Sequence, residues 1–126
     1  MTRFLLLASF AALLSSQPTQ AQTAPQAVAP AVAAELVRKP NVVMLDVRTP
    51  EEFATGHLKG ARNLDFRAPG FSEQVRQLDK SKTYVLYCAS GNRSGQSMTL
   101  MRQLGFGNLV NAGAFKDLKA AGLKAE

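Results

Sequence analysis

The sequence predicts an α/β fold in three layers, with a central, mainly parallel sheet flanked by helices. Short apolar runs of strand length alternate with segments of helical periodicity, which is the pattern of βαβ units. The two strongest runs, VVMLDV (42–47) and YVLY (84–87), are continuously apolar apart from Asp46. Continuous runs, unlike alternating ones, indicate strands that are buried on both faces of a parallel sheet.

The first residues of the chain predict export rather than a structural element. Arg3 precedes an apolar run at 4–14, and Thr19-Gln20-Ala21 ends a polar stretch with a small residue. This is the layout of a secretory signal peptide, because the run is shorter than the roughly 20 residues that span a bilayer. We therefore expect a signal peptide at 1–21, a periplasmic or alternatively a secreted protein, and no stable membrane insertion after cleavage.

One domain is expected after the signal peptide. Residues 22–31 are rich in Ala, Pro, Gln and Thr and predict a flexible lead-in. Residues 32–124 are enough for one domain with a modest core. The net charge of +6 suits an anionic ligand or simple solubility, whereas the dispersed basic residues and the absence of Trp argue against a nucleic-acid partner.

The elements of the first half follow one another closely. Residues 32–36 have a helical pattern that ends before Pro40, and the strand at 42–47 comes next. The capping box Thr49-Pro50-Glu51-Glu52 begins a short helix, which Gly56 ends.

The second half continues the alternation of strands and helices. The predicted elements are a weak strand at 63–66, a helix with apolar positions 71, 75 and 78, the strand 84–87, a helix stopped by Gly105, a strand beginning at 109 and a helix near 115–121. Right-handed crossovers place the strand-to-helix loops at one edge of such a sheet, where ligands bind. The loop after 87 and the corner 46–48 should both open on that edge.

The only cysteine, Cys88, stands at the end of the strand 84–87. A lone cysteine is commonly a small buried hydrophobe, but this one precedes a loop of small residues: Ala89, Ser90, Gly91 and Asn92. Such a loop can turn its N–H groups towards the sulfur, and the following helix adds its positive N-terminus. We therefore expect a reactive thiol with a lowered pKa, which has no partner for an internal disulfide.

Arg93 and Ser94 complete the predicted binding loop. The forked guanidinium of Arg93 suits oxyanions, and Ser94 lies in the first turn of the helix. The predicted site is thus a nucleophile, Cys88, with residues 89–94 around an anionic substrate.

Four polar residues near this edge have less specific predicted roles. Asp46 and Arg48 either support the loop or form an ion pair that braces the corner, and the brace is the better explanation. His57, the only histidine, is expected to stabilise a turn rather than to act as a base. Glu52 is interpreted as a helix N-terminal carboxylate.

Three segments, in this order, resemble the rhodanese family of sulfurtransferases. They are VVMLDVRTPEEFATGHLKGARNLDF, CASGNRS and LGFGNLVNAGAFKDLKAAG. The resemblance covers about residues 30–122 and implies a rhodanese-like domain. An exported chain with S-G-Q after the loop arginine is most similar to the periplasmic phage-shock members, which have a single domain. Ala114 and Leu118 depart from the family's pattern at positions that look structural.

The resemblance implies that Cys88 carries sulfur as a persulfide. The sulfur would come from thiosulfate, with release of sulfite, and pass to cyanide or to a thiol. Amides of residues 89–94 would hold the sulfur and its anionic partners, and Arg93 would orient them. We expect no metal, no organic cofactor and a monomer.

Two other functions remain open. The domain is either the enzyme or a non-catalytic module that stores sulfur or binds a partner. A phosphatase or an arsenate reductase on the same fold is disfavoured, because the phosphatase loop has five residues between its cysteine and arginine. Here four residues separate Cys88 from Arg93, and the smaller loop favours sulfur.

Overall fold

This computed structural model describes residues 25–126, so the predicted signal peptide at 1–21 lies outside the described residues. The strands are β1 (Val42–Asp46), β2 (Arg62–Asn63), β3 (Thr83–Cys88) and β4 (Leu109–Ala114). The helices are α1 (Pro30–Leu36), α2 (Pro50–Thr55), α3 (Phe71–Arg76), α4 (Asn92–Gln103) and α5 (Phe115–Ala120). No helix in this part of the chain is long and apolar enough to cross a membrane.

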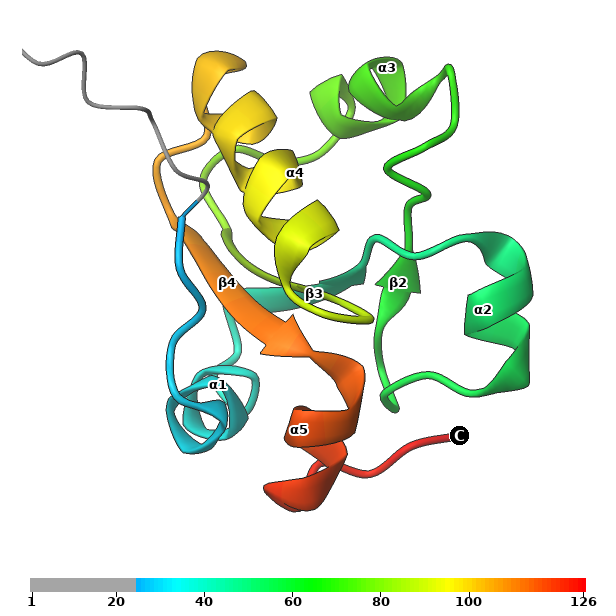
Figure 1. The fold of residues 1–126 in the computed structure, drawn as a ribbon. Helices are drawn as coiled ribbons and strands as arrows, with labels where there is room; N and C mark the ends of the chain where they lie inside the picture. The colour runs from blue at the N-terminus through cyan, green and yellow to red at the C-terminus, as the bar shows by residue number, and fades with distance from the viewer. Residues whose placement is uncertain (1–24) are drawn as a thin grey trace, which may run out of the picture.

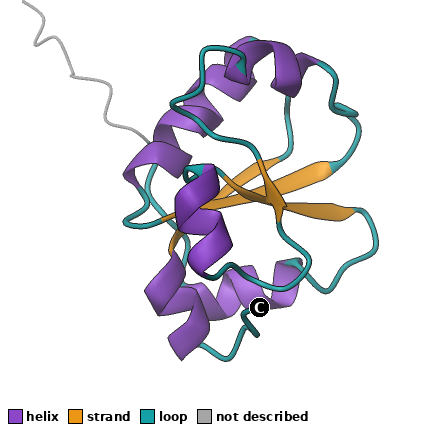
Figure 2. Ribbon diagram, turned by 90° about the vertical axis from the view of Figure 1, so that its right-hand side faces the viewer, coloured by secondary structure: helices purple, strands orange, loops and turns teal. Residues whose placement is uncertain are grey.

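The strands form one sheet in the order β2-β1-β3-β4, and every neighbouring pair is parallel. Figure 1 shows α3 and α4 on one side of the sheet and α1 and α5 on the other, while α2 lies beyond the β2 edge. The turned view in Figure 2 shows the strands as a layer between helices. The predicted three-layer α/β fold with a parallel sheet is therefore confirmed.

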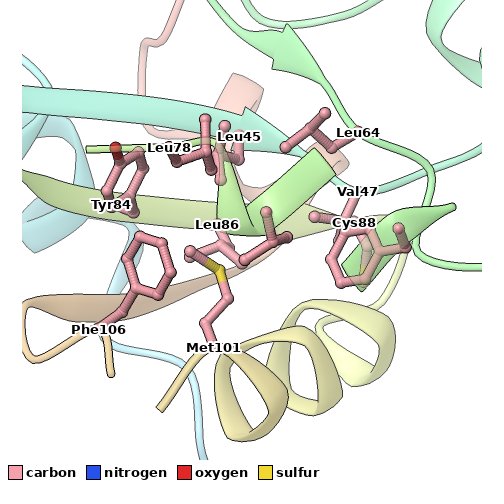
Figure 3. Packing of buried hydrophobic residues seen from close by; sticks show 11 residues of the cluster. Leu45, Val47, Leu64, Leu78, Tyr84, Leu86, Cys88, Met101 and Phe106 are labelled. Carbon is pink, nitrogen blue, oxygen red and sulfur yellow. The ribbon is translucent and has the colours of Figure 1, made fainter. Parts of the chain in front are cut away.

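Both faces of the sheet carry a hydrophobic core, which explains the continuously apolar strands. Along β3, Tyr84, Leu86 and Cys88 belong to the cluster on the α3 and α4 side. Val85 and Tyr87, which alternate with them, belong to the cluster on the α1 and α5 side. Figure 3 shows the first cluster, with Cys88 and Val47 at one end and Tyr84 and Phe106 at the other.

Two strands differ from the expected ones. The weak strand predicted at 63–66 is a regular strand only over Arg62–Asn63. The backbone N–H groups of Leu64 and Phe66 still donate to the carbonyls of Asp46 and Val47, and the Leu64 side chain joins the core on the α3 side. The last strand continues through Asn111 and Gly113 as far as Ala114. Its pairing with β3 shifts by one residue after Leu86, which a β-bulge explains.

The described part of the predicted lead-in contacts the domain. Helix α1 begins at Pro30, inside the range 22–31 that was expected to be flexible. The backbone N–H of Val28 donates to the carbonyl of Asn111, and the carbonyl of Pro25 accepts from the side chain of Asn111. The segment from Pro25 onwards therefore lies along β4.

The helix boundaries follow the local signals in the sequence. The Thr49 hydroxyl accepts from the Glu52 N–H, and the Glu52 carboxylate accepts from the Thr49 N–H, so the capping box of α2 is present. Gly105 takes the left-handed conformation after α4, and Phe106 then packs into the core.

Candidate active site at the end of β3

Cys88 is the last residue of β3, and its side chain is fully buried on the α4 side of the sheet. The loop that follows is exposed at Ala89, Ser90 and Asn92. The thiol therefore lies directly beneath an exposed loop. It is at the carboxyl edge of the parallel sheet, where the sequence predicted it.

Gly91 shapes the loop around the sulfur. Its N–H donates to the Cys88 Sγ at 3.0 Å, and its φ of 92° lies in the left-handed region that favours glycine. A Cβ at this position would lie 3.2 Å from the Cα of Gly113. The loop therefore needs glycine both for its backbone conformation and for its close approach to β4.

The surroundings of the sulfur favour the thiolate. Burial raises the pKa of the Cys88 thiol, but the Ser94 hydroxyl, which can turn to the sulfur, and the backbone N–H groups of Ser94, Ser90 and Gly91 outweigh this effect. The pKa of the thiol is therefore below its ordinary value. The N-terminus of α4, whose first residue is Asn92, adds partial positive charge at the same place.

Arg93 points its guanidinium at a carboxylate on another helix. Two of its nitrogens donate to Glu52 of α2, at 2.7 and 2.9 Å, and both side chains are at least half-buried. The hydrogen bond from Arg93 lowers the pKa of Glu52 to about 2, and Glu52 in turn raises the pKa of Arg93. Sequence reasoning missed this pair, because it assigned Glu52 only to the start of its own helix.

Ser94 and Asn111 form a buried polar connection beside the sulfur. The Ser94 Oγ lies 3.5 Å from the Cys88 Sγ and 2.7 Å from the Asn111 Oδ1. Asn111 was not among the predicted site residues. The signal that identifies it is a polar side chain in the middle of a strand that is buried on both faces.

Asp46 and Arg48 form the corner at the end of β1. The Arg48 guanidinium donates to the Asp46 carboxylate at 2.7 Å and to the carbonyl of Gly56 at 2.7 Å. It also lies over the Phe115 ring, 4.4 Å from the ring centroid. These contacts join β1, α2 and α5, which is the geometry of a structural brace.

His57 lies in the turn after α2. Its ring stacks on Phe53, its Nδ1 lies 3.0 Å from the Phe53 carbonyl oxygen, and its Nε2 lies 3.4 Å from the Glu126 carboxylate. Within residues 25–126, no group of three or more His, Cys, Asp or Glu side chains is arranged to hold a metal ion.

Comparison with known proteins gives one family. The sequence profile of the rhodanese-like domain matches residues 29–121. The chain is 32% identical to thiosulfate sulfurtransferase PspE of Escherichia coli over 74 residues, which is 59% of this chain and 71% of PspE. It is 30% identical to thiosulfate sulfurtransferase GlpE of Pseudomonas putida over 99 residues, which is 79% of this chain and 88% of GlpE.

The solved structures agree. The rhodanese-like domain of the Alr3790 protein from Anabaena superposes with a TM-score of 0.69 at 27% identity, over 81% of this chain and 78% of that one.

Proposed function

Because the chain belongs to the rhodanese-like domain family, we propose that it is a thiosulfate sulfurtransferase that works through a persulfide on Cys88. The observation that carries the proposal is the hydrogen bond from the Gly91 N–H to the Cys88 Sγ at 3.0 Å. It gives the buried sulfur a donor that stabilises negative charge, and four residues separate the cysteine from Arg93. Similar proteins named thiosulfate sulfurtransferase support the same reaction class.

The proposed reaction has two displacements at sulfur. The Cys88 thiolate attacks the outer sulfur of thiosulfate, the S–S bond of thiosulfate breaks, and sulfite leaves with the electron pair. A thiolate or cyanide then attacks the outer sulfur of the persulfide. The new bond releases Cys88 as a thiolate, so the cycle needs no external oxidant or reductant.

The loop has a role in each displacement. The N–H groups around the sulfur, including that of Gly91, stabilise the negative charge of the thiolate and of the persulfide. Arg93 supplies positive charge near the thiolate, which the neighbouring Glu52 partly offsets.

A second candidate is a module that stores sulfur without rapid turnover. The full burial of Cys88 and the pairing of Arg93 with Glu52 favour it. A sheltered persulfide is protected from acceptors, and a paired arginine attracts anionic donors less strongly than a free one.

We also propose export to the periplasm, with secretion as the alternative, and action as a monomer. Export rests on the apolar run at 4–14 and the small residue Ala21. N-terminal sequencing of the protein from a periplasmic fraction should begin at Gln22. A chain that retains Met1 and stays in the cytoplasm would refute export.

Intact mass after incubation with thiosulfate tests the reaction. The native protein should gain one sulfur atom and lose it with cyanide as thiocyanate forms, whereas Cys88→Ala should gain none. A gain of sulfur without repeated thiocyanate production supports the storage module. The absence of a mass gain, or equal thiocyanate from Cys88→Ala, would refute both candidates, and phosphate release from an aryl phosphate would favour a phosphatase.

A further inference from the structure

Asn111 uses its whole side-chain amide at the site. It is 2% exposed in β4. Its Nδ2 lies 2.8 Å from the Pro25 carbonyl oxygen and 3.1 Å from the Gly91 carbonyl oxygen. Its Oδ1 lies 3.0 Å from the Gly113 nitrogen and 2.7 Å from the Ser94 Oγ.

These partners determine which way the amide faces. Carbonyl oxygens only accept hydrogen bonds, so the atom that faces Pro25 and Gly91 is the NH₂ group. The Gly113 N–H only donates, so the atom that faces it is the amide oxygen. An amide oxygen has no proton to give. The hydroxyl of Ser94 must therefore be the donor in its bond to Asn111.

The Ser94 hydroxyl has a single proton for two neighbours. While the hydroxyl donates this proton to the Asn111 Oδ1, the Ser94 Oγ can only accept a hydrogen bond from Cys88. This arrangement suits the protonated thiol. The thiolate can only accept, so it needs the Ser94 hydroxyl to donate its proton to the Cys88 Sγ, which lies 3.5 Å from the Ser94 Oγ. Turning the hydroxyl to sulfur breaks the shorter bond to Asn111, so the two acceptors compete.

We propose that Asn111 is a positioning residue that holds the Ser94 hydroxyl proton away from the Cys88 sulfur and thereby restrains formation of the nucleophile. The loop N–H groups favour the thiolate, and Asn111 opposes the further help that Ser94 can give. The neutral thiol is thus favoured more than it would be beside a Ser94 hydroxyl that was free to turn to the sulfur.

The charged groups around the thiol stay in place when Asn111 is changed. They are Arg93 of α4, which is paired with Glu52 of α2, and the Asp46–Arg48 pair at the end of β1. The strand β4 itself has no charged residue. An altered thiol reactivity after substitution of Asn111 therefore does not report a lost charge. Because the substitution also removes the hydrogen bond to the Gly91 carbonyl, a comparison with and without the Ser94 hydroxyl assigns the effect.

The proposal rests on the proposed function only in taking Cys88 as the reacting group. The rate of alkylation by iodoacetamide against pH tests it without any sulfur donor, and Cys88 is the only cysteine. If thiosulfate fails to load the protein, the proposed function fails while this measurement remains informative.

Four substitutions, two of which are also combined in one protein, give the decisive comparison. Asn111→Leu should lower the pKa of Cys88 and raise the alkylation rate below that pKa by about threefold to tenfold, the effect of one net hydrogen bond. In a Ser94→Ala background the same change should have no effect. Asn111→Asp keeps an oxygen towards Ser94 and should not raise the rate. Ser97→Ala, a buried serine of α4 that donates to the Arg93 carbonyl, is the matched control and should leave the rate unchanged.

Three results would overturn the proposal. They are a rate that Asn111→Leu does not raise, an equal rise in both Ser94 backgrounds, and a rise in Asn111→Asp. Circular dichroism checks that each variant folds. If Asn111→Leu does not fold, NMR of the native protein at a pH where Cys88 is neutral decides. The Ser94 hydroxyl proton should exchange slowly and lie near the Gly113 N–H. A Ser94 hydroxyl proton that lies near the Cys88 β-protons instead would refute the assignment.

Discussion

Gly91 is the residue on which the shape of the cysteine loop depends most directly. Its left-handed backbone turns its N–H to the sulfur, and the missing side chain allows the loop to touch β4. Conformation and close approach are separate demands, so a matched pair of substitutions can separate them.

Gly91→Ala should destabilise the protein by about 1–2 kcal/mol from backbone strain alone, with a further cost from the contact at 3.2 Å with Gly113. Because the loop must shift, the Gly91 N–H moves from the sulfur and alkylation of Cys88 slows. Urea unfolding and the alkylation rate measure the two effects.

Gly60→Ala is the control for this prediction. Gly60 also has a left-handed φ, of 87°, but no atom lies within 4 Å of the position that its Cβ would take. It should show the strain without the change in alkylation. An equal loss of thiol reactivity in both variants would contradict the role given to the contact between Gly91 and β4.

Between elements, the important connection is the one from α2 to α4. Glu52 belongs to the capping box of α2 and also binds Arg93 in the first turn of α4. One carboxylate therefore begins a helix and holds the arginine of the cysteine loop. The short helix α2, beyond the β2 edge of the sheet, is in this way attached to the candidate site (Figure 1).

Glu52→Gln should destabilise the protein by about 1 kcal/mol at pH 7. The folded-state pKa of Glu52 is lowered from 4.5 to about 2, mainly by Arg93, so the stabilisation is present above 4.5 and is lost as the pH falls towards 2. The difference in unfolding free energy between native protein and variant should therefore shrink over this range.

Glu51→Gln is the control, since Glu51 is an exposed first-turn carboxylate of the same helix. Its effect should be only about 0.3 kcal/mol, from the helix dipole. A pH dependence as large as that of Glu52→Gln would show that the dipole, and not Arg93, accounts for the effect.

Across the whole molecule, the sheet separates two cores. Cys88 belongs to the core beneath α3 and α4, and Leu118 of α5 belongs to the other core, with Val85 and Tyr87. Tyr87 ties this second core to the loop after α2, because its hydroxyl accepts from the Leu58 N–H at 3.0 Å.

Leu118→Ala should cost about 2–5 kcal/mol in unfolding free energy, because the side chain is 1% exposed. The pH profile of Cys88 alkylation should stay unchanged, because the cavity opens on the opposite face of the sheet. Denaturant unfolding gives the first quantity and iodoacetamide kinetics the second. A shifted alkylation profile would show that the sheet transmits the disturbance from one face to the other.

Local patterns in the sequence were enough for the fold class and for the position of the thiol. Apolar runs locate β1 and β3, the capping box and Gly56 bound α2, and the small residues after Cys88 predict the loop. These features depend on neighbours within about four residues, which spacing alone can encode. The end of β4 was not foreseen, because Asn111 and Gly113 interrupt its apolar pattern.

Only the tertiary structure decided which distant residues meet at the sulfur. Glu52 is 41 residues from Arg93, and Asn111 is 17 residues from Ser94 and 86 from Pro25. Such contacts depend on the strand order and on the bulge in β4, which bring the carboxyl ends of β3 and β4 together. The sequence by itself determined a cysteine at a strand end before a glycine loop. The tertiary packing brings Glu52 to Arg93 and Asn111 to Ser94, because hydrogen bonds form between groups that are close in space, whatever their separation along the chain.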